Sequence, residues 1–202
     1  MGMPAPIEFF FDFASPYGYF AARRIDGIGA RHGREVAWRP FLLGPAFKAT
    51  GQTPLIQQPL RGEYAIYDWN RLARRGNVPL VLPPGFPMAA LAASRIFYWL
   101  DNRDPALARA FTQRIYHAYF GEGRDMSAPD AVAGEAAALG IDSGAAIAAA
   151  KDEAWKAKLR TVTEEALNRG VFGSPFVFVD GERFWGNDRL DMVDEWLARG
   201  GW

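Results

Sequence analysis

The chain has no cysteine and only two histidines, His32 and His117. Without cysteine the protein forms no disulfide, offers no thiolate to a metal and carries no nucleophilic thiol of its own. Two histidines leave too little material for a histidine metal site, so we expect no metal. These absences exclude two-cysteine redox chemistry and thiolate-based metal sites.

An excess of charge is also missing, because 23 lysines and arginines balance 23 aspartates and glutamates. Such a chain is not expected to have nucleic acid or an anionic membrane as its main partner. No apolar run approaches the roughly 18 residues of a membrane span. The N-terminus lacks the basic and long apolar regions of a secretion signal. We therefore expect a soluble cytoplasmic protein.

A strand–helix–strand pattern opens the chain. The aromatic-rich run IEFFFDF (7–13) ends at a turn, which predicts a buried strand. Apolar residues at helical spacing predict a helix from Pro16 to about His32, and EVAWRPFLL predicts a second strand from Glu35. A strand, a helix and a second strand this close together in the sequence form a βαβ unit, which implies that the two strands are parallel.

The middle of the chain contains only loop and helix signals. Residues 43–62 hold many turn formers and lack a sustained period, so we predict a long loop with room for one helical turn. From Glu63 to Gly170 the pattern is helical throughout, and local start and stop signals divide it. The predicted helices span 63–76, 87–101, 104–120, 127–139, 142–149 and 151–169.

Strand signals return after Gly170. Two short apolar runs flank Asp180-Gly181, a strong hairpin signal, and a last helix is predicted over 188–199. The βαβ and ββα halves must share one sheet, because neither buries its apolar face alone. We predict an α/β fold with a thioredoxin-like core (1–45 and 170–202) and a large inserted helical domain with its leading loop (46–169).

Ser15-Pro16 follows the first strand and is the first candidate for chemistry. The pair is an efficient helix opener without any function. The same position also suits an anion, since a helix start offers free N–H groups and Ser15 adds a hydroxyl donor. A nucleophilic serine would need a base, yet the sequence has no G-x-S-x-G elbow. His32 lies about 24 Å away by helix rise, which argues against a triad.

Two further places each have a structural and a functional interpretation. Pro175 opens a strand, which is tolerated; if its bond to Ser174 is cis, the backbone there is exposed to a peptide-like ligand. Periodicity does not distinguish cis from trans. Asn187 and Asp188 are ordinary helix-opening residues, and they also suit a ligand with an ammonium and a carboxylate group.

The helix predicted over 63–76 is rich in arginine and tyrosine. By default its arginines form a solvated face, although Arg61 at the loop–helix junction could bind a carboxylate with two hydrogen bonds. We expect the aromatic residues of the helical region to lie in the core rather than in a pocket. The arginines are Arg61, Arg71, Arg74 and Arg75, and the aromatic residues are Tyr64, Tyr67, Phe86, Trp99, Tyr116 and Tyr119.

Together these segments resemble a known family. FDFASPYGYFAARR, GVFGSP and FWGNDR occur in the order seen in 2-hydroxychromene-2-carboxylate isomerases, with an Arg-Gly-x-Tyr element at 61–64 in the intervening gap. The related kappa-class glutathione transferases share the pattern, and both groups belong to the DsbA-like thioredoxin superfamily. The resemblance spans nearly the whole chain.

The resemblance implies glutathione as cofactor and a homodimer. Ser15, followed by Pro16 and Tyr17, matches the serine that hydrogen-bonds the glutathione sulfur. Gln52 stands where an asparagine that contacts glutathione is common in kappa-class proteins. Arg61 stands where a lysine is usual, so the charge is kept but the geometry of the Arg61 contact differs. Ser174, which precedes Pro175, matches the residue whose backbone pairs with the cysteinyl part of glutathione. Asn187 and Asp188 match the pair that holds the γ-glutamyl end.

The implied activity is a glutathione-dependent cis–trans isomerisation of 2-hydroxychromene-2-carboxylate or a related aromatic acid, by reversible thiolate addition. Ser15 would keep the thiol ionised, and Tyr17 and Asp68 are candidates for moving the substrate proton. One alternative is a kappa-like transferase that conjugates electrophiles. The other is a non-catalytic thioredoxin-like module that binds a peptide or protein at the Pro175 edge.

Overall fold

The computed structural model describes residues 5–202 and is built around one four-stranded sheet. The strands are β1 (Ile7–Phe11), β2 (Val36–Pro40), β3 (Phe176–Val179) and β4 (Glu182–Trp185), in the order β2-β1-β3-β4. β1 and β2 are parallel, whereas β3 is antiparallel to both β1 and β4. The prediction that the two ends of the chain share one sheet is therefore confirmed.

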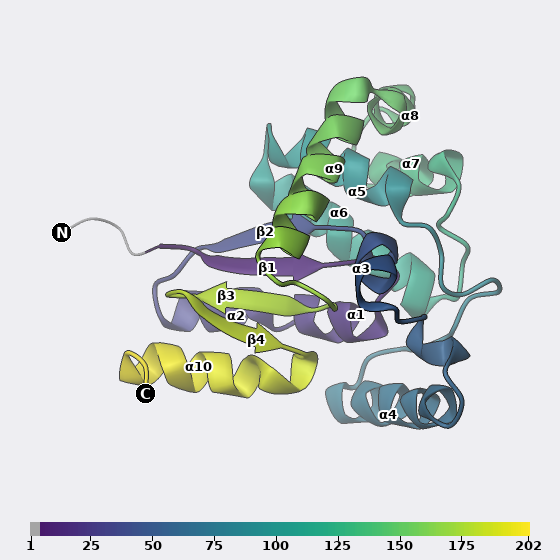
Figure 1. The fold of residues 1–202 in the computed structure, drawn as a ribbon. Coiled ribbons are helices and arrows are strands. Elements are labelled where there is room, and N and C mark those ends of the chain that lie inside the picture. Colours follow the sequence, from purple (N-terminus) through teal and green to yellow (C-terminus); the bar gives the residue numbers. More distant parts are fainter. Residues whose placement is uncertain (1–4) are drawn as a thin grey trace.

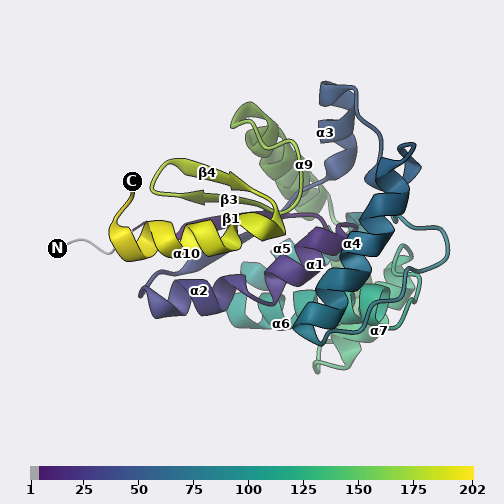
Figure 2. The same cartoon turned by 90° about the horizontal axis from the view of Figure 1, so that it is seen from below.

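Helices cover both faces of this sheet. α1 (Pro16–Ala22) and α2 (Ile25–Arg31) connect β1 to β2 and lie over one face, while α9 (Glu153–Asn168) lies over the other (Figures 1 and 2). α10 (Leu190–Arg199) follows a 3-10 turn over Asn187–Arg189 and contacts β4 and α2. This is the thioredoxin-like α/β arrangement that the order of elements predicts.

The long segment between β2 and β3 is mainly helical, as predicted. Its first half contains α3 (Leu43–Thr50), a 3-10 turn (Leu55–Gln57), α4 (Arg61–Gly76) and α5 (Leu91–Asp101). The second half contains α6 (Pro105–Tyr116), a π turn (His117–Gly121), α7 (Pro129–Ala137), α8 (Ser143–Lys151) and α9. That residues 46–169 form a domain of their own stays a prediction. None of the helices in residues 5–202 has the length and hydropathy of a membrane span.

Two segments differ from the sequence prediction. The single helix predicted from Pro16 to His32 breaks between α1 and α2, where Arg24 donates to the Asn187 carbonyl at 3.2 Å and pairs with Asp191. Residues 43–62 are not mostly loop, because they contain α3. The first N–H group of that helix, at Leu43, donates to the Asp12 carboxylate at 2.7 Å, so the helix start depends on a residue far away in the sequence.

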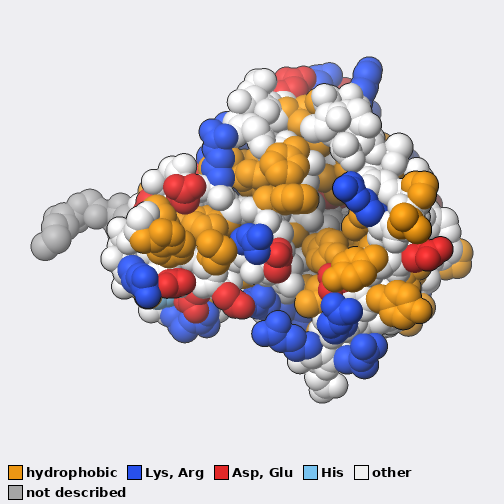
Figure 3. Space-filling view, turned by 60° about the horizontal axis from the view of Figure 1, so that its bottom comes forward, with side chains coloured by type: hydrophobic (Ala, Val, Ile, Leu, Met, Phe, Trp, Pro, Cys, Tyr) orange, Lys and Arg blue, Asp and Glu red, His pale blue; other side chains and the backbone are white. Residues whose placement is uncertain are grey.

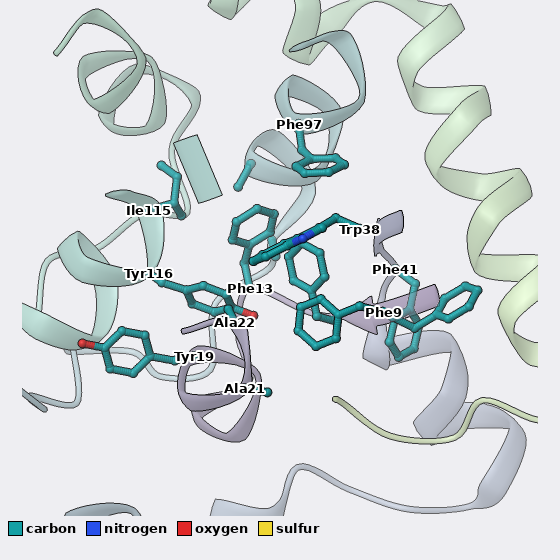
Figure 4. Packing of buried hydrophobic residues seen from close by; sticks show 14 of the residues in the cluster. Phe9, Phe13, Tyr19, Ala21, Ala22, Trp38, Phe41, Phe97, Ile115 and Tyr116 are labelled. Carbon is teal, nitrogen blue, oxygen red and sulfur yellow. The ribbon is translucent and has the colours of Figure 1, made fainter. Parts of the chain in front are cut away.

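Aromatic side chains fill the core beneath β1. Phe11 is fully buried, with its ring centroid 5.1 Å from Phe9, 5.4 Å from Trp38 and 6.0 Å from Phe97. Figure 4 shows labelled neighbours from this cluster converging from the sheet and from α5. Because interiors are close-packed, this cluster fixes the position of the carboxyl end of β1.

The prediction that the aromatic residues of the helical region are core is right for some and wrong for others. Trp99, Tyr116 and Tyr119 are buried. Tyr64 and Tyr67 are 60% and 74% exposed, because α4 buries a different stripe. That stripe consists of Gly62, Ala65, Trp69 and Ala73.

We expect Phe11→Ala to lower the free energy of unfolding by about 3–5 kcal/mol, since it removes a fully buried ring and leaves a cavity. Tyr67→Ala removes an exposed ring as a control and should change it by less than about 0.5 kcal/mol. Denaturant unfolding followed by circular dichroism measures both. Similar losses for the two variants would contradict the assignment of Phe11 to the core.

Candidate functional site

A cavity of about 1240 Å³ opens at the carboxyl end of β1, between the sheet, α1, α3 and α4. Figure 3 shows a hollow on this face, with apolar side chains around it and basic side chains near its rim. The predicted site residues that line the cavity are Ser15, Pro16, Tyr17, Gln52, Arg61, Ser174, Asn187 and Asp188. Pro175 is the exception, and it lies directly beside the lining residue Ser174.

Ser15 joins the start of α1 to the loop before β3. As the N-cap, its Oγ accepts a hydrogen bond from the Gly18 N–H at 3.1 Å. The same hydroxyl donates to the Ser174 carbonyl at 2.9 Å. The Ser174-Pro175 peptide bond is cis, which decides the question that periodicity left open. Both serines are buried, with 5% and 8% exposure, and they meet across 159 residues of sequence.

Close backbone approach at Gly18 holds these parts together. A Cβ atom there would lie 2.6 Å from the Tyr116 hydroxyl and 3.2 Å from Ser174 Oγ. The Tyr116 hydroxyl in turn donates to the Asp12 carbonyl at 3.0 Å. Gly18 therefore lets α1 pack against the loop and α6 with no side chain between them.

Asp12 is a site residue that the sequence analysis did not select. Its carboxylate accepts from the N–H groups of Ala14 (2.8 Å) and Leu43 (2.7 Å), and its own N–H donates to Ser174 Oγ (2.9 Å). Burial raises the pKa of the Asp12 carboxyl to about 6, because it outweighs the two hydrogen bonds, which lower this pKa. The signal in the sequence is an acid placed directly after a buried strand.

Tyr17 and Asp68, the two candidates for proton transfer, lie in contact. The Tyr17 hydroxyl on α1 donates to the Asp68 carboxylate on α4 at 2.9 Å. Burial, then the hydrogen bond to Asp68, raises the pKa of Tyr17 above its ordinary value. Arg71 also contacts Asp68, at 3.3 Å. The pair connects the thioredoxin-like core with α4, beside which α1 lies in Figure 2.

A polar group at the α3–α4 junction brings Gln52 and Arg61 together through Gln58. The Gln58 amide donates to Thr53 O at 2.8 Å and to Gln52 Oε1 at 3.5 Å. Arg61 donates to Gln58 Oε1 at 3.3 Å. Sequence reasoning missed Gln58, and no local signal separates it from the neighbouring Gln57.

The third polar group is formed by the turn before α10. Asn187 is buried, with 5% exposure, and its Oδ1 atom has no hydrogen-bond donor within residues 5–202. Asp188 is exposed and pairs with Arg189 at 2.9 Å. Buried polar atoms are nearly always hydrogen-bonded, so Asn187 Oδ1 is suited to a donor group on a ligand.

Neither histidine takes part in this site. His32 lies 2.7 Å from Asp194, His117 lies 3.4 Å from Glu122, and neither lines the cavity. Ser15 therefore has no histidine base, in agreement with the argument against a triad. In the described part of the chain, no group of three His, Asp or Glu side chains could hold a metal ion.

A family model and several known proteins match most of the chain. A family model described as a DSBA-like thioredoxin domain matches residues 6–198. A 2-hydroxychromene-2-carboxylate isomerase of Sphingobium xenophagum is 30% identical over 197 residues, which cover 96% of this chain and 99% of the relative. Glutathione S-transferase kappa 2 of Caenorhabditis elegans is 26% identical over 205 residues, covering 95% and 91%.

Among solved structures, selenomethionine 2-hydroxychromene-2-carboxylate isomerase superposes with a TM-score of 0.87 at 27% identity. The superposition covers 96% of this chain and 94% of that chain. The family resemblance seen in the sequence and the predicted fold class are both confirmed.

The buried Asp12 predicts a pH-dependent stability. Its folded-state pKa of about 6 lies above the ordinary aspartate value of 3.8, so the folded protein holds this proton more tightly than the unfolded chain. The free energy of unfolding should therefore fall by up to about 3 kcal/mol as pH rises from about 4 to about 7. Urea unfolding of wild type and Asp12→Asn across this range isolates the effect. Parallel pH profiles for the two proteins would refute it.

Proposed function

The chain belongs to the family of DsbA-like thioredoxin domains, and from this premise we propose that it is a glutathione-dependent cis–trans isomerase of 2-hydroxychromene-2-carboxylate or a related aromatic acid. The observation that carries the proposal is the position of Ser15. Its hydroxyl lies against the Ser174 carbonyl at the edge of a cavity whose other polar groups match the two ends of glutathione.

The residues present fit glutathione. The buried Asn187 Oδ1 lacks a donor, and the γ-glutamyl ammonium group would supply one, with the Asp188 carboxylate beside it. Arg61 and Gln52 would hold the glycyl carboxylate at the α3–α4 junction. Ser174 would pair with the cysteinyl backbone between these ends. Each part of the tripeptide thus has a group of matching charge or hydrogen-bonding type.

When bound, glutathione would supply a nucleophilic thiolate that adds reversibly to a conjugated carbon and so permits rotation there. Ser15 would stabilise the anionic sulfur through its hydroxyl. In the structure this hydroxyl donates to the Ser174 carbonyl, so binding requires it to exchange that acceptor for the sulfur. A hydrogen bond to a charged group contributes about 1.5–3 kcal/mol, which lowers a thiol pKa by about one to two units.

Tyr17 and Asp68 would move the substrate proton. Because the Tyr17 hydroxyl donates to Asp68, its oxygen is left as an acceptor towards the cavity. The phenol would take a proton from a substrate hydroxyl as its own proton passes to Asp68, and would return it later. Such a relay keeps the tyrosine neutral, consistent with its raised pKa.

The cavity has room for two ligands at once. Sites for a single small molecule measure roughly 300–1,000 Å³, and this one measures about 1240 Å³. Its lining includes the apolar side chains of Trp69, Leu72 and Phe86, which suit an aromatic ring beside glutathione.

A kappa-like transferase is the second candidate, favoured by the relative in Caenorhabditis elegans. The two reactions differ in the fate of glutathione. For the isomerase, we expect free glutathione to stay constant while the chromene carboxylate is converted, and no glutathionyl adduct to accumulate. Mass spectrometry of the reaction mixture measures this. A stoichiometric adduct would identify the transferase instead.

We expect Ser15→Ala to reduce isomerase kcat/KM by about ten- to a hundredfold, since a hydrogen bond to the thiolate is lost. Glutathione titration calorimetry in buffers of different ionisation enthalpy should show proton release for the wild type near neutral pH and less for the variant. Loss of the α1 N-cap also costs about 1 kcal/mol of stability.

Asp142→Ala is the matched control for that loss. It removes the N-cap of α8, which lies outside the cavity lining, and should leave binding and turnover unchanged. Near-normal turnover in Ser15→Ala would remove Ser15 from the mechanism. If the wild type does not bind glutathione, the result would favour the other alternative, a non-catalytic module that binds a peptide or protein at the Pro175 edge. Gel filtration tests the homodimer that the resemblance implies.

A further inference from the structure

One face of α4 lines the cavity along almost the whole helix. Its lining residues are Arg61, Tyr64, Asp68, Trp69, Leu72 and Arg75. Apart from Trp69, which follows Asp68 directly, they recur at intervals of three or four residues, as one face of a helix requires. Arg61 and Arg75 stand near opposite ends, 14 residues or about 21 Å apart by helix rise. Arg61 lies with the residues proposed to hold glutathione, whereas Arg75 lies beyond them.

Arg75 is one of four arginines in the cavity lining. Arg24 is paired with Asp191 and Arg189 with Asp188. Within residues 5–202, neither Arg61 nor Arg75 forms an ion pair with a carboxylate. The cavity lining therefore contains two arginines that are not in an ion pair, and the proposed glutathione site uses only Arg61.

An apolar wall separates the two cations. The wall begins with the ring of Tyr17, whose centroid lies 6.0 Å from that of Trp69. The centroids of Trp69 and Phe86 are 5.8 Å apart, and both pairs pack edge to face. Further apolar lining residues follow, namely Leu72, Pro87, Met88 and Leu91. This wall leads from the proposed reaction centre towards the end of α4 that carries Arg75.

We infer that Arg75 binds the carboxylate of the substrate, and that the site selects aromatic acids over their neutral analogues. The inference rests on the proposed function and names the residue that sets its substrate class. Arg75 follows Asp68 by seven residues, about 10 Å along α4. A ring with an unsaturated acid side chain fits this separation, with its ring against the wall and its carboxylate on the guanidinium, which binds carboxylates through two parallel hydrogen bonds.

Binding of two unreactive compounds tests the inference without turnover. trans-Cinnamate is an aromatic acid, and cinnamamide is its neutral analogue of nearly the same shape. For the full-length wild type, with and without glutathione, we expect calorimetry to show cinnamate binding roughly tenfold or more tightly than cinnamamide. Arg75→Met should abolish this preference while leaving glutathione affinity unchanged.

Arg74→Met is the matched control. Arg74 is the neighbouring residue, is also exposed and carries the same charge, but it does not line the cavity. Its loss should keep the preference for the acid. In an isomerase assay, Arg75→Met should raise KM for the chromene carboxylate about tenfold with little change in kcat, and Arg74→Met should change neither.

The outcomes separate this inference from the proposed reaction. If Arg75→Met keeps the preference, if both variants lose it equally, or if the wild type shows none, the inference is overturned. If the preference depends on Arg75 and glutathione binds but no isomerisation occurs, the carboxylate site stands and the proposed reaction fails.

Discussion

The candidate site depends on one buried carboxylate. Asp12 is buried at the end of β1, where its two oxygens accept hydrogen bonds from the N–H groups of Ala14 and Leu43 and its own N–H donates to Ser174 Oγ. These bonds join the turn before α1, the start of α3 and the cis-proline loop. A buried charge is costly unless it is hydrogen-bonded, so the three segments must come together for the carboxylate to be tolerated. Ser15, at the start of α1, lies between these segments and donates to the Ser174 carbonyl.

The same carboxylate limits the chemistry that the site supports. With a pKa of about 6, Asp12 is mostly ionised at neutral pH, and its charge opposes a second anion nearby. In the proposed reaction, Ser15 would therefore have to stabilise an anionic sulfur against this field, with a hydroxyl that is itself buried. Low local polarity would strengthen both effects. A serine suits this proposed task because it donates a hydrogen bond without adding charge, and a chain without cysteine could not form a disulfide with a bound glutathione thiol.

Sequence signals predicted a helix or turn correctly where neighbouring residues determine where it begins or ends. The Asp104 side chain caps α6, and Asp180 and Gly181 adopt the positive φ values that a tight hairpin requires. The prediction failed where the cause lies elsewhere in the chain. α3 begins on a hydrogen bond to Asp12, and the break between α1 and α2 is held by Arg24 at the turn before α10. Sequence periodicity contains neither contact.

The site divides in the same way. Motifs selected the residues around the proposed sulfur position, because short segments next to the sheet carry them. The apolar residues that line the cavity near α4 were mostly missed, since the patterns of Trp69, Leu72 and Phe86 do not distinguish core packing from a cavity wall, and these side chains contribute to both. α4 contacts the thioredoxin-like core mainly through α1, and the Tyr17–Asp68 bond spans that contact. If the proposed function holds, changes along its cavity face could therefore alter which acid is bound while Asp12, Ser15 and the cis-proline loop keep their positions. The proposed chemistry and the proposed specificity thus depend on different elements.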